Sequence, residues 1–140
     1  MIQRDILQDQ IKELARVLST ILGKFIGFKT SGEIQVGIDK TSKQLKAKLD
    51  IDLGELIHLS QNDLKSYLIE RKITKGHFQI LANYLLEIGK AKMSYQKKEA
   101  KIYLQKSIEL LEIEDEISET LCLDRMNQKT NVNMLIQELL

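Results

Sequence analysis

The chain contains no proline, only 7 glycines and 1 cysteine, and no long uninterrupted run of apolar residues. Proline and glycine interrupt helices, so their scarcity among 140 residues favours long helices with short loops over a sandwich or barrel. The single cysteine, Cys122, excludes an intramolecular disulfide framework and fits a reducing compartment. No stretch approaches the roughly 18 apolar residues that cross a bilayer. Charges recur from Arg4 onward, so we expect no signal peptide and a cytoplasmic protein.

The charge of the chain also lacks a dominant sign. Lys and Arg number 21 against 20 Asp and Glu, which leaves a formal net charge of +1. Such a balance gives no reason to expect a nucleic acid or an anionic membrane surface as partner, and any electrostatic recognition must be local. With 43% hydrophobic and 29% charged residues, the chain can form one ordinary domain with its own core.

What the sequence has in abundance is helical periodicity. Apolar residues near the N-terminus recur alternately four and three positions apart, which is typical of one face of a helix. They are Leu7, Ile11, Leu14, Leu18, Ile21, Phe25 and Phe28. Ser31 and Gly32 then end this first helix, and a second apolar stripe from Ile34 to Leu49 predicts a helix that folds back on it. We therefore expect a hairpin over residues 2–50.

Further helices are expected along the rest of the chain. The predicted segments are short connecting helices (about 53–72), a second hairpin (about 75–113) and C-terminal helices (about 115–140). Ser60 is the expected N-cap of a connecting helix, and Ser94 that of the second helix of the later hairpin. We interpret the polar run Asn127–Asn131 as a break before a terminal helix from about Val132, which docks as a cap.

These segments predict an all-α fold of antiparallel hairpins, arranged as a right-handed stack or a helical bundle with a C-terminal capping helix. Periodicity also selects the residues expected in the core. They are Leu14, Leu18, Ile21, Leu81, Leu85, Leu104 and Ile108.

Two resemblances support this fold. Leu85–Gly89 followed by Ala100–Leu110 resembles a tetratricopeptide unit, although Ser107 stands where alanine is usual and the closing proline is missing. Met1–Asp5 and Leu49–Gly54 resemble a family of short, uncharacterised bacterial helical proteins, which implies the fold but no activity.

The two hairpins also match each other at several positions, and an internal repeat is one explanation of that match. Sliding the chain along itself until Gly23 meets Gly89 brings Ile38 onto Leu104. Two copies of one unit and a chance register of two amphipathic hairpins both explain this match.

No catalytic residue, metal ligand or cofactor follows from the polar side chains. His58 and His77 lack a carboxylate or cysteine at metal-binding spacing, and we interpret both as ordinary helix-end residues. Cys122 has no neighbouring base to form a thiolate, so we expect a buried structural thiol. The acidic run Glu109–Glu119 lacks the glycine and alternation of a calcium loop and is interpreted as a solvated helix end.

The candidate partner-binding residues lie in the later hairpin. Ile80 and Tyr84 form a second apolar stripe on their helix, which indicates a central helix with two apolar faces. Lys97, Lys98 and Lys101 lie in the early turns of the next helix, where the helix dipole disfavours positive charge. Either a neighbouring acidic helix supplies their partners, or they serve an anionic ligand, or they form a solvated face.

Three functional hypotheses remain. The leading one is a non-enzymatic protein–protein interaction or scaffold module that binds a protein or peptide partner in a groove between hairpins. The second is a structural homo-oligomer formed through the first helix, because Val17 and Leu22 broaden its apolar face. The third is a small enzyme or ligand-binding protein with no recognisable motif.

Overall fold

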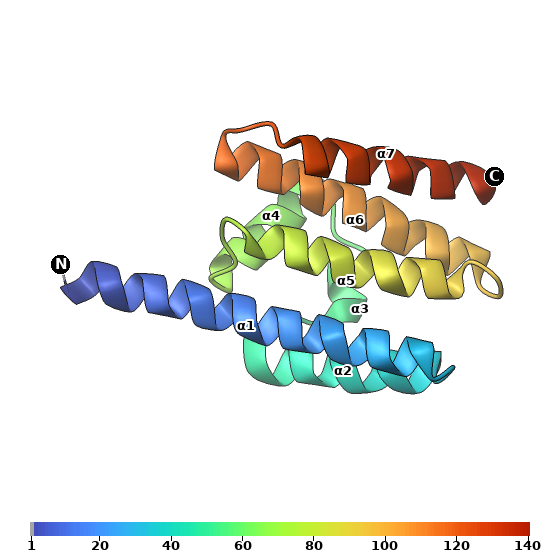
Figure 1. Cartoon of the computed structure of the whole chain (residues 1–140), viewed down its shortest axis with the longest axis horizontal. Coiled ribbons are helices and arrows are strands. Elements are labelled where there is room, and N and C mark those ends of the chain that lie inside the picture. Colours follow the sequence, from blue (N-terminus) through green and yellow to red (C-terminus); the bar gives the residue numbers. More distant parts are fainter. Residues whose placement is uncertain (1) are drawn as a thin grey trace.

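The computed structural model describes the backbone of residues 2–140 and the side chains of residues 7–140. Over this range the chain forms helices and no strand, so the predicted all-α fold is confirmed (Figure 1). The helices are, in chain order, α1 (Ile2–Thr30), α2 (Ile34–Leu49), α3 (Leu53–Leu56), α4 (Gln61–Glu70), α5 (His77–Lys92), α6 (Lys97–Ser118) and α7 (Leu123–Glu138).

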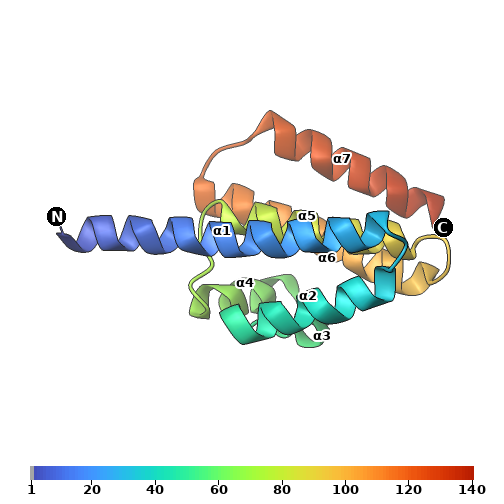
Figure 2. The ribbon, with the colours of Figure 1, turned by 60° about the horizontal axis from the view of Figure 1, so that its bottom comes forward.

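The long helices lie side by side in the order α2, α1, α5, α6 and α7 (Figure 1). The chain thus stacks two antiparallel hairpins, α1–α2 and α5–α6, and closes with a single helix. The short helices α3 and α4 connect the hairpins on one side of the stack, where α3 contacts α2 and α4 contacts α6 (Figure 2). The helices α1 and α5 contact each other and join the two hairpins at the centre.

The first hairpin has the boundaries that the sequence predicts. Gly32 turns the chain with a φ of 76°, a left-handed conformation that glycine adopts without strain. The amide of Glu33 then donates to the carbonyl of Phe28 at 2.9 Å. A Cβ atom on Gly37 would lie 2.5 Å from the Cβ of Phe28, so glycine at this position lets the two helices approach closely near their turn.

The predicted start of α4 is correct and that of α6 is wrong. The Ser60 hydroxyl accepts a hydrogen bond from the amide of Asp63 at 3.3 Å and caps α4. Ser94 does not cap α6, because the chain leaves α5 through a turn in which the amide of Gln96 donates to the carbonyl of Lys92 at 2.8 Å. The helix α6 therefore begins only at Lys97.

The polar run Asn127–Asn131 lies inside α7 and does not break it, contrary to the prediction. The break falls earlier, where Glu119 adopts a left-handed conformation with a φ of 56°. Asn127, Thr130 and Asn131 face solvent, whereas Gln128 bonds to Asn83 of α5 and Lys129 to Asp115 of α6, and the following Val132 is buried. The run is therefore part of a helix that is exposed on one side and bonded to α5 and α6 on the other, which polarity alone does not distinguish from a loop.

Most of the predicted core is buried. At most 2% of the surface is exposed at Leu18, Ile21, Leu81, Leu85 and Leu104. Leu14 and Ile108 are half-buried and contact the core from its edges. Leu7, the first residue of the predicted stripe, is 58% exposed. The apolar stripe of α1 thus begins before the point at which neighbouring helices cover it.

The second hairpin closes around Gly89. A Cβ atom at this position would lie 2.8 Å from Cδ2 of Leu104 and 3.3 Å from the carbonyl oxygen of Ala100. A small residue at this contact is what the tetratricopeptide resemblance implies for Gly89. The tetratricopeptide-like stacking of the hairpins, the repeat and the relation to a bacterial family stay predictions.

Candidate interaction surface

Tyr84 is buried and cannot contact a partner, so its place among the candidate binding residues is corrected. Only 2% of its surface is exposed, and its hydroxyl lies 2.7 Å from Oγ1 of Thr41. Its ring meets that of Phe25 edge to face at 5.9 Å. Burial raises the pKa of Tyr84, and the hydrogen bond with Thr41 opposes this rise. Tyr84 joins α5 to α1 and α2, and the half-buried Ile80 contacts the same core.

The three candidate lysines lie at the other end of the α5–α6 hairpin from Ile80. Lys97 and Lys98 are exposed and Lys101 is half-buried. Among the described side chains none of them forms an ion pair, because Glu99, the acid of their turn, bonds to Lys92 at 2.7 Å. No acidic helix supplies partners for the three lysines, and their role in binding stays a prediction.

His77 is a structural link between α1 and α5 and is more than an ordinary helix-end residue. It is 1% exposed. Its Nδ1 accepts a hydrogen bond from the amide of Thr74 at 3.0 Å, so Nε2 carries the proton and donates to the carbonyl of Ile11 at 2.8 Å. Both nitrogens of the neutral ring are therefore occupied.

The acidic run of α6 is a solvated end only in part, because Glu112, Glu116 and Glu119 are exposed as expected while Glu114 is buried. Glu114 is 1% exposed, and its carboxylate accepts hydrogen bonds from the amides of Gly76 at 2.8 Å and Gln79 at 3.3 Å. It thereby caps the N-terminus of α5, where the helix dipole favours negative charge. This carboxylate fixes one helix of the hairpin to the other.

Asp115 fixes α6 to α7. Its carboxylate accepts hydrogen bonds from Arg125 at 2.6 Å and from Lys129 at 2.8 Å. Burial raises the pKa of Asp115, but these two bonds outweigh burial and hold the pKa below its usual range. The carboxylate is therefore ionised and doubly paired in the fold.

The remaining reactive residues do not assemble into a site. His58 is exposed, and Cys122 is half-buried just before α7, so the expectation of a buried thiol is wrong. The helix break at Glu119 places this cysteine in the connection. Within residues 7–140, no three His, Cys, Asp or Glu side chains are grouped so that they could hold a metal ion.

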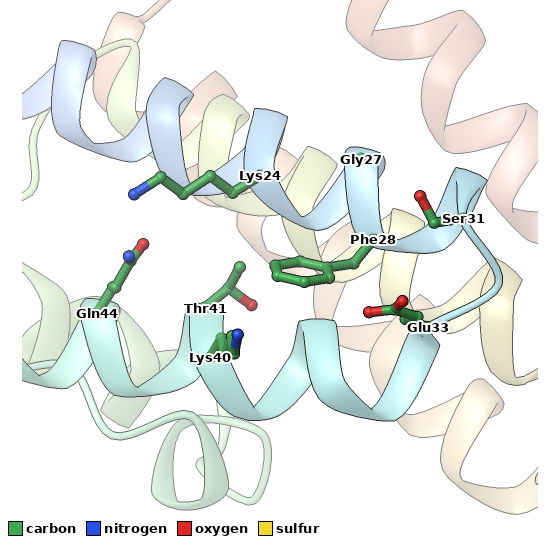
Figure 3. Close-up of a pocket in the computed structure, with 8 residues that line it drawn as sticks. All are labelled: Lys24, Gly27, Phe28, Ser31, Glu33, Lys40, Thr41 and Gln44. Carbon is green, nitrogen blue, oxygen red and sulfur yellow. The ribbon is translucent and has the colours of Figure 1, made fainter.

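A hollow of about 500 Å³ lies between the C-terminal part of α1 and the N-terminal part of α2 (Figure 3). Phe28 points into the space between the helices, and the ammonium of Lys40 lies 5.5 Å from the centre of its ring. Lys24 and Glu33 lie at separate edges of the hollow. The hydroxyl of Thr41 is already bonded to Gly37 and Tyr84. The polar groups around the hollow therefore do not converge on one point where a ligand could be held.

A larger and more apolar depression, which we call the α1 groove, lies beside the N-terminal half of α1. Its volume is about 670 Å³. Half of its lining residues are apolar side chains of α1 and the end of α2, and the other half are polar or charged. The lining residues are Leu7, Gln10, Ile11, Glu13, Leu14, Val17, Lys48, Leu49, Lys72 and Thr74.

Two lysines, Lys48 and Lys72, belong to the lining of the α1 groove, and we call this pair the lysine wall. Lys48 belongs to the last turn of α2, and Lys72 lies between α4 and α5. In the described part of the chain neither lysine forms an ion pair. Glu13, which also lines the groove, bonds to Arg16 of its own helix; this bond and the nearby charge of Lys48 hold the pKa of the Glu13 carboxyl below its usual range. The groove thus combines apolar side chains with two lysines that form no ion pair in the described part of the chain.

Comparisons of the chain with protein-family models, curated proteins and solved structures found no match. Among the described helices, none has the length and hydrophobicity needed to span a bilayer.

The α1 groove was not among the predicted sites, although one signal for it exists in the sequence. The stripe of the first helix begins at Leu7, and the partner helix of the hairpin is shorter, with 29 residues in α1 against 16 in α2. An antiparallel partner of that length cannot cover the beginning of α1. The lysine wall had no such signal, because Lys48 and Lys72 meet only in the folded chain.

Proposed function

We propose that the protein is a non-enzymatic protein–protein interaction or scaffold module that binds an amphipathic helix of its partner in the α1 groove. The observation that carries this proposal is an apolar groove of about 670 Å³ that stays open at Leu7. Grooves of this kind receive a helix through apolar residues spaced three and four positions apart.

The charge of the groove defines the chemistry of the partner helix. Lys48 and Lys72 lie along one wall without partners among the described side chains. A helix with carboxylates beside its apolar stripe would neutralise them, and complementary charge of this kind sets specificity and speeds association. The proposed partner is therefore an acidic amphipathic helix.

The use of the buried polar side chains also supports a binding role. His77 joins α1 to α5, Glu114 joins α6 to α5, and Asp115 joins α6 to α7. Each of these groups is occupied by hydrogen bonds that hold two helices together. The bond of His77 to Ile11 holds in place a residue that lines the groove, and a preformed surface loses less entropy on binding.

The test is a binding titration with a designed fluorescent peptide of about 20 residues, in which leucines recur every three or four positions and glutamates flank them. We expect this peptide to bind dilute protein, and a lysine-flanked version to bind at least about tenfold more weakly. Leu7→Glu should abolish binding because it places a charge on the apolar floor.

The matched control is Leu123→Glu, which makes the same change at a residue that is 70% exposed on α7, at the other edge of the stack. This variant should bind as the native chain does. Equal binding of a scrambled peptide of the same composition, or equal loss in the two variants, would contradict the proposal.

A further inference from the structure

The beginning of α1 projects past the rest of the molecule (Figures 1 and 2). The helix α5 starts beside Ile11, where His77 bonds to the carbonyl of that residue at 2.8 Å. At 1.5 Å per residue, the preceding helical segment 2–10 is about 13 Å long. The described side chains of this segment, at residues 7–10, are exposed, so another surface could cover them.

The projecting segment and the α1 groove share residues. Leu7 belongs to the segment and also lines the groove, together with Gln10 and Leu14. A two-fold symmetric interface requires one surface to supply both the inserted residues and the site that receives them. An antiparallel pairing about an axis near Gln10 meets this requirement, because it places Leu7 of each copy beside the partner's Leu14.

The charges agree with the same pairing. Asp9 is exposed on the projecting segment and forms no ion pair among the described side chains. It lies four residues before Glu13, so the two carboxylates form one acidic side of α1, of which Glu13 borders the groove. In the antiparallel arrangement this acidic side approaches the wall that carries Lys48 and Lys72 of the other copy.

We propose that the occupant of the α1 groove is a second copy of this chain, which inserts its own α1 in the antiparallel direction and forms a two-fold symmetric dimer. This inference rests on the proposed function, since it names the amphipathic helix that the groove receives. The interface buries Leu7 and joins Asp9 of each copy to the lysine wall of the other.

Sedimentation equilibrium from about 1 to 500 μM tests the proposal, because a dimer in this range shows a molar mass that rises with concentration. Leu7→Glu should raise the dimer Kd by about 100-fold or more, since it buries an unpaired charge in each half of the interface. Leu123→Glu is the matched control and should leave the Kd unchanged. Gln10→Lys keeps the apolar floor intact but sets two like charges at the axis, so it should also weaken the dimer.

Charge reversal checks the pairing across the interface. Asp9→Lys alone, and Lys48→Glu with Lys72→Glu, should each raise the dimer Kd roughly threefold to tenfold. The triple variant that combines the three changes should recover most of the affinity, because opposite charges again face each other. Failure of the triple variant to recover would overturn the proposed pairing.

The outcomes separate this inference from the proposed function. A native chain that is monomeric at every concentration, yet binds the acidic peptide, overturns the second copy as occupant and leaves the groove as a site for another protein. A dimer that dissociates in Leu123→Glu but not in Leu7→Glu also overturns it, since the contact then lies on α7. A dimer that Leu7→Glu dissociates and the acidic peptide competes away supports both.

Discussion

The two halves of α1 carry the same apolar stripe and have different surroundings. In the C-terminal half, Leu18, Ile21 and Phe25 are at most 2% exposed, because α2 and α5 lie beside them. In the N-terminal half, Leu7 is 58% exposed and borders an open groove. The spacing of apolar residues therefore marks the side of a helix that can be buried, and the neighbouring helices decide how much of that side is buried within the chain. The uncovered part is where we expect function.

The largest expected difference is between Leu18→Ala and Leu7→Ala. Leu18 is 2% exposed, so its truncation leaves a cavity and should lower the free energy of unfolding by about 2–5 kcal/mol. Leu7→Ala should change it by less than about 0.5 kcal/mol in dilute, monomeric protein. Urea denaturation with unchanged slopes measures both values. Similar losses in the two variants would mean that the projecting half is buried as deeply as the other.

Two glycines extend the comparison to positions that lack a side chain. Gly89→Ala should destabilise by about 1–3 kcal/mol, because the added Cβ meets Leu104 at 2.8 Å within the α5–α6 hairpin. Gly23→Ala should stabilise by about 0.5–1 kcal/mol, because no atom lies within 4 Å of the new Cβ and alanine favours the helix. Thermal unfolding shows the sign of each change. Stabilisation by Gly89→Ala would show that the hairpin opens freely at this contact.

A smaller effect is expected at Asp115, which holds α7 by charge. Its pKa is lower in the folded chain than the unfolded value of about 3.9, so its contribution to stability is complete above about pH 4 and is lost as the pH falls through the lower folded pKa. Asp115→Asn should cost about 1–2 kcal/mol at pH 7 and weaken the dependence of stability on pH below about pH 4. Melting temperatures from about pH 7 to pH 2 measure this difference. An unchanged acid dependence would contradict the assigned role.

Features that depend on local chemistry could be predicted from the sequence. The hydroxyl of Ser60 caps α4 as expected, and α2 begins and ends at the predicted residues. Features that depend on tertiary neighbours could not. The polar run Asn127–Asn131 looked like a break because no sequence pattern shows that Val132 finds a buried place beside it.

The same limit applies to the candidate site. Tyrosine is a residue type that is common at interfaces, but Thr41 and Phe25 from the other hairpin enclose Tyr84. Glu114 looked solvated, and only the arrival of the α5 N-terminus shows that it is a cap. The α1 groove has walls from α1, the end of α2 and the α4–α5 connection, so its lysines are brought together by the fold alone.

The smallest effect concerns Lys97, Lys98 and Lys101 at the start of α6. Among the described side chains they have no ion-pair partner, and each cation near a helix N-terminus costs about 0.3–1 kcal/mol at low salt. Changing all three to Gln should therefore raise the melting temperature by about 1–3 °C. Lys92→Met is the control. The side chain of Lys92 is 5% exposed and bonds to Glu99, so its loss should lower the melting temperature.

The binding of the acidic peptide separates this lysine cluster from the α1 groove. The helix α6 begins at the end of the stack away from the projecting segment (Figure 1). The triple Gln variant should therefore bind the peptide as the native chain does, because Lys48 and Lys72 remain in place. A salt-sensitive loss of binding would show that the cluster belongs to the same interaction surface. A fall in melting temperature would instead show that these lysines stabilise the fold, and their assignment to partner binding would then be withdrawn.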